Sequence, residues 1–416
     1  MSPLFARRQF LKFGVAGVSV AGALPAFVRK TVAAVERQSD PHDDRILVVV
    51  QLSGGNDGIS TVVPYGDPAY AAARSSTRID ESSVLRIDEH VGLHPNLKEL
   101  KGLYDEGRMA IVQGVSYPNP TRSHFEAMDI WNAGDLSGAR RGSGWLGRAL
   151  DQLVKQADPT AGVNVGNKVA LAMVGERIKP VAFEDPDRYR WRGRSTQYDA
   201  FKAFNGETPD AMPEKGADSK VGELDFLLRV AHGADESSAA IRKAVTGYQT
   251  SASYPENNNR LAPGLRNIAA MIAGGLTTRV YYASLGGFDT HANQRATHDN
   301  LMTAFSGAVS AFMGDLGAKK LLDRVTILAF TEFGRRVKEN GSRGTDHGVA
   351  GPMFVFGGRV HGGLFGKYPS LTDLDKGDLK MAVDFRRVYA TILDRWLGAD
   401  SKAVLGAAHE PLKFLA

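Results

Sequence analysis

The sequence contains no cysteine among its 416 residues. Disulfide bonds, thiolate metal ligands and a cysteine nucleophile are therefore excluded. If the protein is exported, its folded state must be held by its hydrophobic core, or by a metal bound through other ligands. Hydrophobic residues make up 43% of the chain, which is enough for a full core and excludes general disorder.

An excess of charge is also missing once the N-terminus is set aside. Residues 1–34 contain no acidic residue and five basic ones, namely Arg7, Arg8, Lys12, Arg29 and Lys30. The other 46 of the 51 basic residues stand against 46 acidic residues, so the remainder of the chain is neutral overall. This balance does not support a basic footprint for nucleic acid, and we expect no nucleic-acid partner.

Long apolar runs are missing except for residues 13–28, which are rich in glycine and alanine. This run is short for a membrane span, which needs about 20 residues. Arg7-Arg8 and the following "QFLK" resemble the twin-arginine export motif, and small residues at Ala33 and Ala34 fit a cleavage site. The alternative is an amphipathic helix or a membrane anchor.

We therefore expect a twin-arginine signal peptide at residues 1–34 and a linker at residues 35–44. The twin-arginine translocase would be the partner during export, and the mature protein would be periplasmic or secreted. No later segment is long and apolar enough to span a membrane, so we expect no stable membrane span after cleavage.

What the chain does contain is an alternation of apolar runs and amphipathic segments. The near-continuous β-branched run at residues 46–52 is typical of a strand buried on both faces of a parallel sheet. Further strands are predicted at residues 110–116, 278–286, 325–330 and 353–360. Helices are predicted around residues 94–109, 119–134, 144–153, 222–248, 264–276, 298–318 and 384–398.

This alternation predicts an α/β protein with a doubly wound, mostly parallel sheet flanked by helices. We expect residues 45–416 to form one domain. Residues 185–222 are polar and broken by proline, glycine and charge, so they are expected to be an irregular insertion or lid.

Four polar clusters follow predicted strands, at residues 53–57, 121–126, 288–291 and 332–347. Each cluster alone could be an ordinary turn, a helix cap or a solvated ion pair. Ligands in open α/β sheets bind beyond the carboxyl ends of the strands, where these clusters would meet. Carboxylate and imidazole together suit zinc, manganese or iron. A hydroxyl nucleophile between metal and arginine suits phosphoryl or sulfuryl transfer.

Six stretches, in this order along the mature chain, resemble a bacterial twin-arginine-exported family known as domain of unknown function 1501. They are "VVVQLSGGNDG", "PTRSHFEAMDIW", "GGFDTHANQ", "FTEFGRR", "GTDHG" and "DFRRVYATILDRWLG". That family is in turn similar to the alkaline phosphatase and sulfatase superfamily, which implies an alkaline-phosphatase-like fold.

The resemblance implies roles for particular positions. The implied metal ligands are Asp57, Asp289, His291, Glu332, Asp346 and His347. The implied nucleophile is Ser123, with Thr121 as the second choice, and the anion would be held by Arg122 or Arg335. One or two divalent ions are expected, zinc in the first place and manganese or another ion as alternatives.

The sequence departs from the superfamily pattern at two positions. Phe333 stands where the superfamily places a histidine ligand, so a complete two-metal site is in doubt. Pro118 stands at the cysteine position of the sulfatase motif, which excludes a formylglycine sulfatase as far as this motif goes.

Three functions are compatible with these residues. The first is an exported metal-dependent hydrolase of a phosphate or sulfate ester, whose substrate is a small molecule or an anionic polymer. The second is a non-catalytic envelope binding protein that keeps the fold and has a decayed metal site. The third is a metal-dependent hydrolase or isomerase of a carbohydrate or another non-ester substrate.

Overall fold

The structure is a computed structural model that describes residues 44–140, 142–155, 158–189, 235, 237–257 and 259–415. The chain from residue 45 onward forms one compact unit. The expected signal peptide, nearly all of the expected linker and the part of the expected insertion at residues 190–222 lie outside the described residues. Within the described ranges, no helix combines the length and apolarity needed to cross a membrane.

A large sheet forms the centre of this unit, in the order β11-β5-β10-β9-β1-β8-β6-β7, and β14 also pairs with β5. Its strands are β1 (Ile46–Ser53), β5 (Met109–Ser116), β6 (Gly162–Val165), β7 (Val181–Phe183), β8 (Val280–Gly286), β9 (Val325–Phe330), β10 (Gly351–Gly357), β11 (Gly363–Phe365) and β14 (Val383–Asp384). Only β10 runs antiparallel to its neighbours in the described sheet, β5 and β9. The prediction of a mostly parallel sheet is therefore confirmed.

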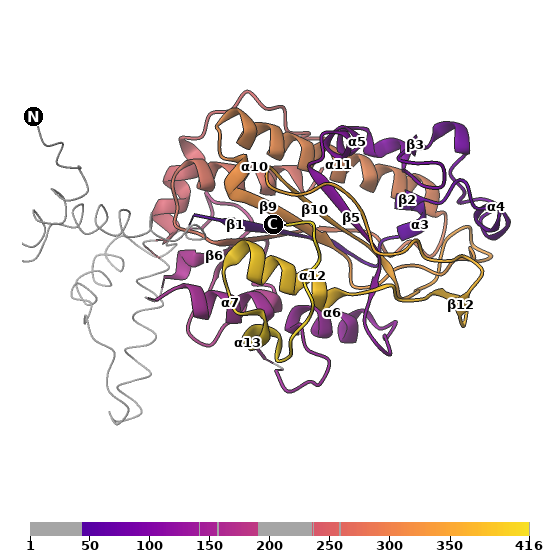
Figure 1. The fold of residues 1–416 in the computed structure, drawn as a ribbon. Helices are drawn as coiled ribbons and strands as arrows, with labels where there is room; N and C mark the ends of the chain where they lie inside the picture. The colour runs from indigo at the N-terminus through magenta and orange to yellow at the C-terminus, as the bar shows by residue number, and fades with distance from the viewer. Residues whose placement is uncertain are drawn as a thin grey trace, which may run out of the picture. The chain divides into compact units, whose positions relative to one another are not determined.

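The alternation of side chains along β1 explains why its first five residues are all apolar. Val48 and Val50 belong to the core on one face of the sheet, whereas Leu47 and Val49 belong to the core on the other face. Helices cover both faces (Figure 1). One face carries α5 (Lys98–Asp105), α10 (Ala262–Ala273) and α11 (Gln294–Ala318), and the other carries α6 (His124–Ala133), α7 (Trp145–Leu153), α12 (Phe385–Thr391) and α13 (Ser401–Leu405).

Smaller elements complete the described structure. A three-stranded sheet contains β2 (Val62–Val63), β4 (Gly92–Leu93) and β3 (Leu85–Arg86), and a hairpin contains β12 (Leu374–Asp375) and β13 (Asp378–Leu379). Short helices are α3 (Gly58–Thr61) and α4 (Pro68–Ala73), and a π-helical segment at Ile392–Leu397 continues α12. Of the helix expected at residues 222–248, the described part is helical at residues 237–246.

Candidate metal centre

The carboxyl ends of three parallel neighbours, β8, β1 and β9, place polar loops at one edge of the sheet. In the register of these strands, Gln51 of β1 lies opposite Ser284 of β8 and Phe330 of β9. The three loops that follow these strands therefore begin at the same level along the strand direction. A fourth loop, after β5, brings in the first residue of α6, His124.

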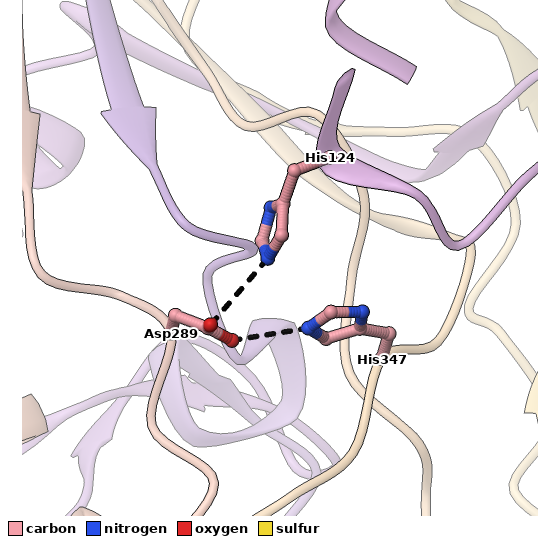
Figure 2. Close-up of side chains that lie close together, drawn as sticks. All are labelled: His124, Asp289 and His347. Carbon is pink, nitrogen blue, oxygen red and sulfur yellow. Dashed lines mark hydrogen bonds and ion pairs between the residues drawn. The ribbon is translucent and has the colours of Figure 1, made fainter. Parts of the chain in front are cut away.

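Three side chains from these loops point toward one another (Figure 2). Possible ligand atoms of His124, Asp289 and His347 all lie within 4.8 Å of one another. Asp289 Oδ1 is 3.0 Å from His347 Nε2, and Asp289 Oδ2 is 3.5 Å from His124 Nε2. Neighbouring ligands around a tetrahedral zinc lie roughly 3.3 Å apart when each is about 2.0–2.1 Å from the ion. The separations fit one metal ion.

His291 extends this group to four residues. Its Nε2 lies 3.0 Å from Asp289 Oδ1 and 2.9 Å from His347 Nε2. We call His124, Asp289, His291 and His347 the His–Asp cluster. Of the six expected metal ligands, Asp289, His291 and His347 are brought together here.

The second nitrogen of each histidine ring is held by an oxygen acceptor. The contacts are His124 Nδ1 to Glu332 Oε1 at 2.8 Å, His347 Nδ1 to the carbonyl oxygen of Arg122 at 2.8 Å, and His291 Nδ1 to Asp346 Oδ1 at 3.3 Å. A carbonyl or an ionised carboxylate can only accept, so the single hydrogen of a neutral ring serves either its Nδ1 acceptor or Asp289, not both. With that hydrogen on Nδ1, as in a histidine that binds metal through Nε2, Nε2 carries a lone pair that faces the cluster.

This assignment leaves the cluster rich in lone pairs and poor in donors. Two Nε2 atoms that both carry lone pairs lie 2.9 Å apart, in His291 and His347. His124 Nε2 is buried and has no hydrogen-bond partner among the described residues. Converging acceptors without a donor between them repel, whereas a bound cation satisfies them together. The residues present therefore fit a metal ion.

The charge of the cluster is fixed by Asp289. Burial raises the pKa of this carboxyl, but the hydrogen bond and the charge of Arg335 outweigh that effect and lower the pKa to about 2. A hydrogen bond from Asn340 lowers the pKa of Asp346, the carboxyl behind His291. Both groups are therefore ionised at neutral pH.

Arg335 connects these loops to one another through hydrogen bonds. Its side chain is fully buried, with 0% exposure. Its guanidinium donates to Gly55 O at 2.7 Å, Thr345 O at 2.9 Å, Phe288 O at 2.9 Å and Asp289 Oδ1 at 2.7 Å, and also to Gly54 O. It joins the loops that follow β1, β8 and β9. A guanidinium occupied in this way has no face for a substrate anion, which does not fit the expected role of Arg335.

Asp57 lies in a separate buried network. Arg74 donates to both of its carboxylate oxygens, at 2.6 and 3.0 Å, and both side chains have 0% exposure. Burial raises the pKa of Asp57, but the charge and hydrogen bonds of Arg74 outweigh it and hold the pKa well below its usual range. Asp57 was expected as a metal ligand, and the structure pairs it with a guanidinium instead.

The two expected nucleophiles lie just before His124. Ser123 is the N-cap of α6 and accepts from Glu126 N at 3.5 Å. Thr121 Oγ1 donates to Glu126 Oε2 at 2.7 Å and accepts from Ser123 N at 3.1 Å. Among the described residues, neither hydroxyl hydrogen-bonds to the His–Asp cluster, and only the Ser123 hydroxyl keeps its own hydrogen available.

His124 is the member of the cluster that the sequence-based ligand set omits. It lies inside the motif "PTRSHFE", where its place after a capping serine favoured an ordinary helix start. Glu332 and Asp346, which were expected as ligands, contact the far nitrogens of His124 and His291. Phe333 packs its ring against His124 and His347, with centroids 4.8 Å from each. It forms an apolar wall at the position where a further histidine was considered.

Fold and site together define a class, a mostly parallel α/β protein with a His–Asp cluster at the carboxyl ends of its strands. Residues 107–410 match the family described as "Protein of unknown function (DUF1501)", and the chain belongs to that family. A comparison with curated protein sequences finds no match.

Solved structures with some similarity have low scores. A sulfatase from Pseudoalteromonas sp. is 11% identical, with 95% of this chain and 76% of that chain covered and a TM-score of 0.39. A protein in the alkaline phosphatase superfamily from Vibrio parahaemolyticus is 10% identical, with 78% and 63% covered and a TM-score of 0.32. The C-terminal periplasmic domain of EcEptC from Escherichia coli, solved with Zn, is 9% identical, with 75% and 73% covered and a TM-score of 0.29. Scores this low carry no argument about activity.

Proposed function

We propose that the protein binds one divalent metal ion, zinc in the first place, through the His–Asp cluster. Imidazole and carboxylate are ligands that zinc accepts, and His124, Asp289 and His347, whose ligand atoms lie within 4.8 Å of one another, would leave a tetrahedral ion one open position for a substrate. The remaining expected ligands have other partners. Asp57 is paired with Arg74, and Glu332 and Asp346 hold the rings of His124 and His291. This distribution supports one ion and not two.

The proposed activity is hydrolysis of a phosphate or sulfate ester, carried by a small molecule or an anionic polymer, after twin-arginine export. A bound metal would supply positive charge that stabilises an oxyanion and lowers the pKa of a hydroxyl. Ser123 is the proposed nucleophile. Its oxygen would bond to phosphorus or sulfur, its proton would go to solvent, and the ester oxygen would leave and take up a proton. Water would then release the anion from the serine.

One observation carries this proposal: the Nε2 atoms of His124, His291 and His347 lie 3.5, 3.0 and 3.0 Å from the Asp289 carboxylate, and the buried His124 Nε2 has no hydrogen-bond partner among the described residues. A structural role alone does not explain that arrangement. Buried polar atoms in folded proteins are nearly always hydrogen-bonded, so this nitrogen is available to bind a metal ion.

The test begins with metal content. Purified protein is expected to retain about one zinc per chain, the content of a single-ion site. His124→Ala should lose it, whereas His90→Ala, which removes an exposed histidine outside the cluster, should keep it. Aryl phosphate and aryl sulfate esters then test hydrolysis. A protein that binds no metal and cleaves neither ester would favour the non-catalytic envelope binding protein.

Ser123→Ala separates the nucleophile from the metal site. We expect this variant to keep its metal, because the Ser123 hydroxyl makes no hydrogen bond to the cluster among the described residues, and to lose ester hydrolysis by at least about a hundredfold, as for loss of a covalent nucleophile. Thr121→Ala is the matched control. Hydrolysis that survives in Ser123→Ala would exclude the serine and leave Thr121 or a water molecule as the attacking group, and Thr121→Ala distinguishes these two.

A further inference from the structure

A buried carboxylate on the β12–β13 hairpin joins two arginines that border the cluster. Asp378 has a side-chain exposure of 2%. Arg122 Nε donates to Asp378 Oδ2 at 3.0 Å, and Arg122 Nη2 contacts the same oxygen. Arg336 Nε lies 3.7 Å from Asp378 Oδ1, an atom that has no hydrogen-bond partner in the described part of the chain. One carboxylate thus accepts hydrogen bonds from Arg122 and forms an ion pair with Arg336.

Both arginines are anchored beside the His–Asp cluster through their backbones. The carbonyl of Arg122 accepts from His347 Nδ1 at 2.8 Å, and the amide of Arg336 donates to Asp346 O at 3.0 Å. The backbones of both arginines therefore border the His–Asp cluster or the residue next to it.

Both arginine side chains are partly exposed to solvent. The Arg122 side chain is 40% exposed and that of Arg336 is 38% exposed. Among the described residues, no hydrogen bond uses Arg122 Nη1 or either Nη atom of Arg336. Two positive charges and one negative charge leave a net positive charge at this place. Arg335, the nearby alternative, is fully buried and its donors are occupied.

We propose that Arg122 and Arg336, positioned by Asp378, bind an oxyanion of the substrate beside the His–Asp cluster. Guanidinium groups present paired donors that match phosphate, sulfate and carboxylate oxygens. Asp378 is a positioning residue: it is too buried to meet substrate, and it binds both arginines while other donors of their guanidinium groups stay available. As a substrate site, this rests on the proposed function, while anion binding itself is tested without hydrolysis.

Inorganic phosphate is the probe, titrated calorimetrically into the full chain with zinc and after chelation. Arg122→Gln and Arg336→Gln are each expected to weaken phosphate binding at least about tenfold in both forms, the usual effect of losing a charged hydrogen bond. Arg86→Gln, at an exposed arginine paired with Glu81, is the control and should leave binding unchanged. Unchanged binding in both Arg122→Gln and Arg336→Gln overturns the proposal.

Asp378→Asn tests the positioning role, because the amide keeps the shape and loses the charge. Weaker phosphate binding with unchanged zinc content is expected. Tighter binding would show that Asp378 competes with the anion, which overturns the positioning role. Arg336→Lys is a second variant that keeps the charge and loses the fork. It should bind phosphate less tightly than the wild type and more tightly than Arg336→Gln. Wild-type affinity in Arg336→Lys would show that the paired donors of the guanidinium group are not needed for phosphate binding.

Two substrates decide which oxyanion is bound. We compare an aryl phosphate with the same ester bearing a ring carboxylate. If the arginines bind the ester anion itself, Arg122→Gln lowers kcat/KM for both substrates, and if they bind a second anionic group, only the carboxylated ester is affected. Wild-type kcat/KM for both would overturn the inference. Phosphate binding that depends on the arginines in a protein that cleaves neither ester would keep the anion site and remove the proposed activity.

Discussion

At the residue scale, some side chains of the candidate metal centre face the position of the metal, and others orient those side chains through hydrogen bonds. Glu332 is 1% exposed, and its Oε1 accepts from Gly54 N at 2.9 Å as well as contacting His124 Nδ1 at 2.8 Å. One buried carboxylate oxygen therefore orients His124 and ties it to the loop after β1. Such partners orient a ligand ring and raise its basicity.

Glu332→Ala should weaken zinc binding about 10- to 100-fold, the usual effect of losing a group that holds a ligand histidine. The measurement is competition with a chromophoric chelator on folded protein. Glu81→Ala, at an exposed carboxylate, is the control and should keep wild-type affinity. Equal zinc affinity in Glu332→Ala and the wild type would show that His124 does not depend on this carboxylate.

The ion pair of Asp57 and Arg74 gives a prediction for acid stability. The pKa of Asp57 is lowered in the folded state, so its contribution to stability is present above the unfolded value of about 3.9 and is lost as the pH falls toward the folded value. Asp57→Asn should cost about 3–5 kcal/mol at pH 7, because Arg74 loses its buried partner charge.

Urea unfolding of the wild type and Asp57→Asn checks this at pH 7 and again below about pH 3.9, the unfolded pKa. The difference in unfolding free energy should be smaller at the lower pH. Asp80→Asn, at a carboxylate with 71% exposure, should differ little from the wild type at either pH. A difference for Asp57→Asn that does not change with pH would contradict the assigned ionisation.

At the scale of elements, the loop after β1 matters because it packs against the loop that carries Asp289. Gly54 has a φ of +118°, and a Cβ there would lie 2.6 Å from Asp289 N. Gly55 has a φ of +78°, and a Cβ there would lie 2.5 Å from the Phe333 ring. The close approach requires glycine at both positions. The sequence pattern "SGGND" thus serves the site through its backbone.

Gly54→Ala should destabilise the protein by at least about 1 kcal/mol and weaken zinc binding, because the added methyl group pushes the Asp289 backbone away. Gly102→Ala is the matched control. Gly102 lies inside α5, and a Cβ there meets nothing within 4 Å, so alanine should stabilise the helix by up to about 1 kcal/mol. Thermal unfolding and zinc affinity check both variants. Wild-type zinc affinity in Gly54→Ala would mean that the contact does not position Asp289.

At the scale of the whole molecule, the sequence predicted long elements better than short ones. The strand predicted at residues 325–330 coincides with β9, because six consecutive buried residues leave a clear apolar run. β6 and β7 were not predicted, since segments of four and three residues carry too little periodicity. The antiparallel direction of β10 was not predicted either, because a fully buried strand has the same apolar pattern in both directions.

The sequence predicted which loops form the site better than it predicted the role of each residue in it. Strand-end clusters located Asp289, His291 and His347, but the sequence could not tell which carboxylates face the cluster. That distinction depends on long-range partners such as Arg74 for Asp57 and His124 for Glu332. Asp57 and Arg74 are 17 positions apart, and His124 and Glu332 are 208 positions apart, so these pairs cannot be recognised from local residue spacing.

The cluster also joins distant parts of the chain, which predicts how metal affects global stability. Its ligands follow β5, β8 and β9, so an ion bound there connects three loops that are separate in the unfolded chain. Zinc that binds only the folded state stabilises it by about 2.7 kcal/mol at a free concentration 100 times the Kd. Chelation should therefore lower Tm, and added zinc should restore it. His347→Ala should unfold at the same temperature with and without zinc, whereas His90→Ala should show the wild-type shift. A chelator effect of equal size in His347→Ala would place the stabilising metal outside the cluster.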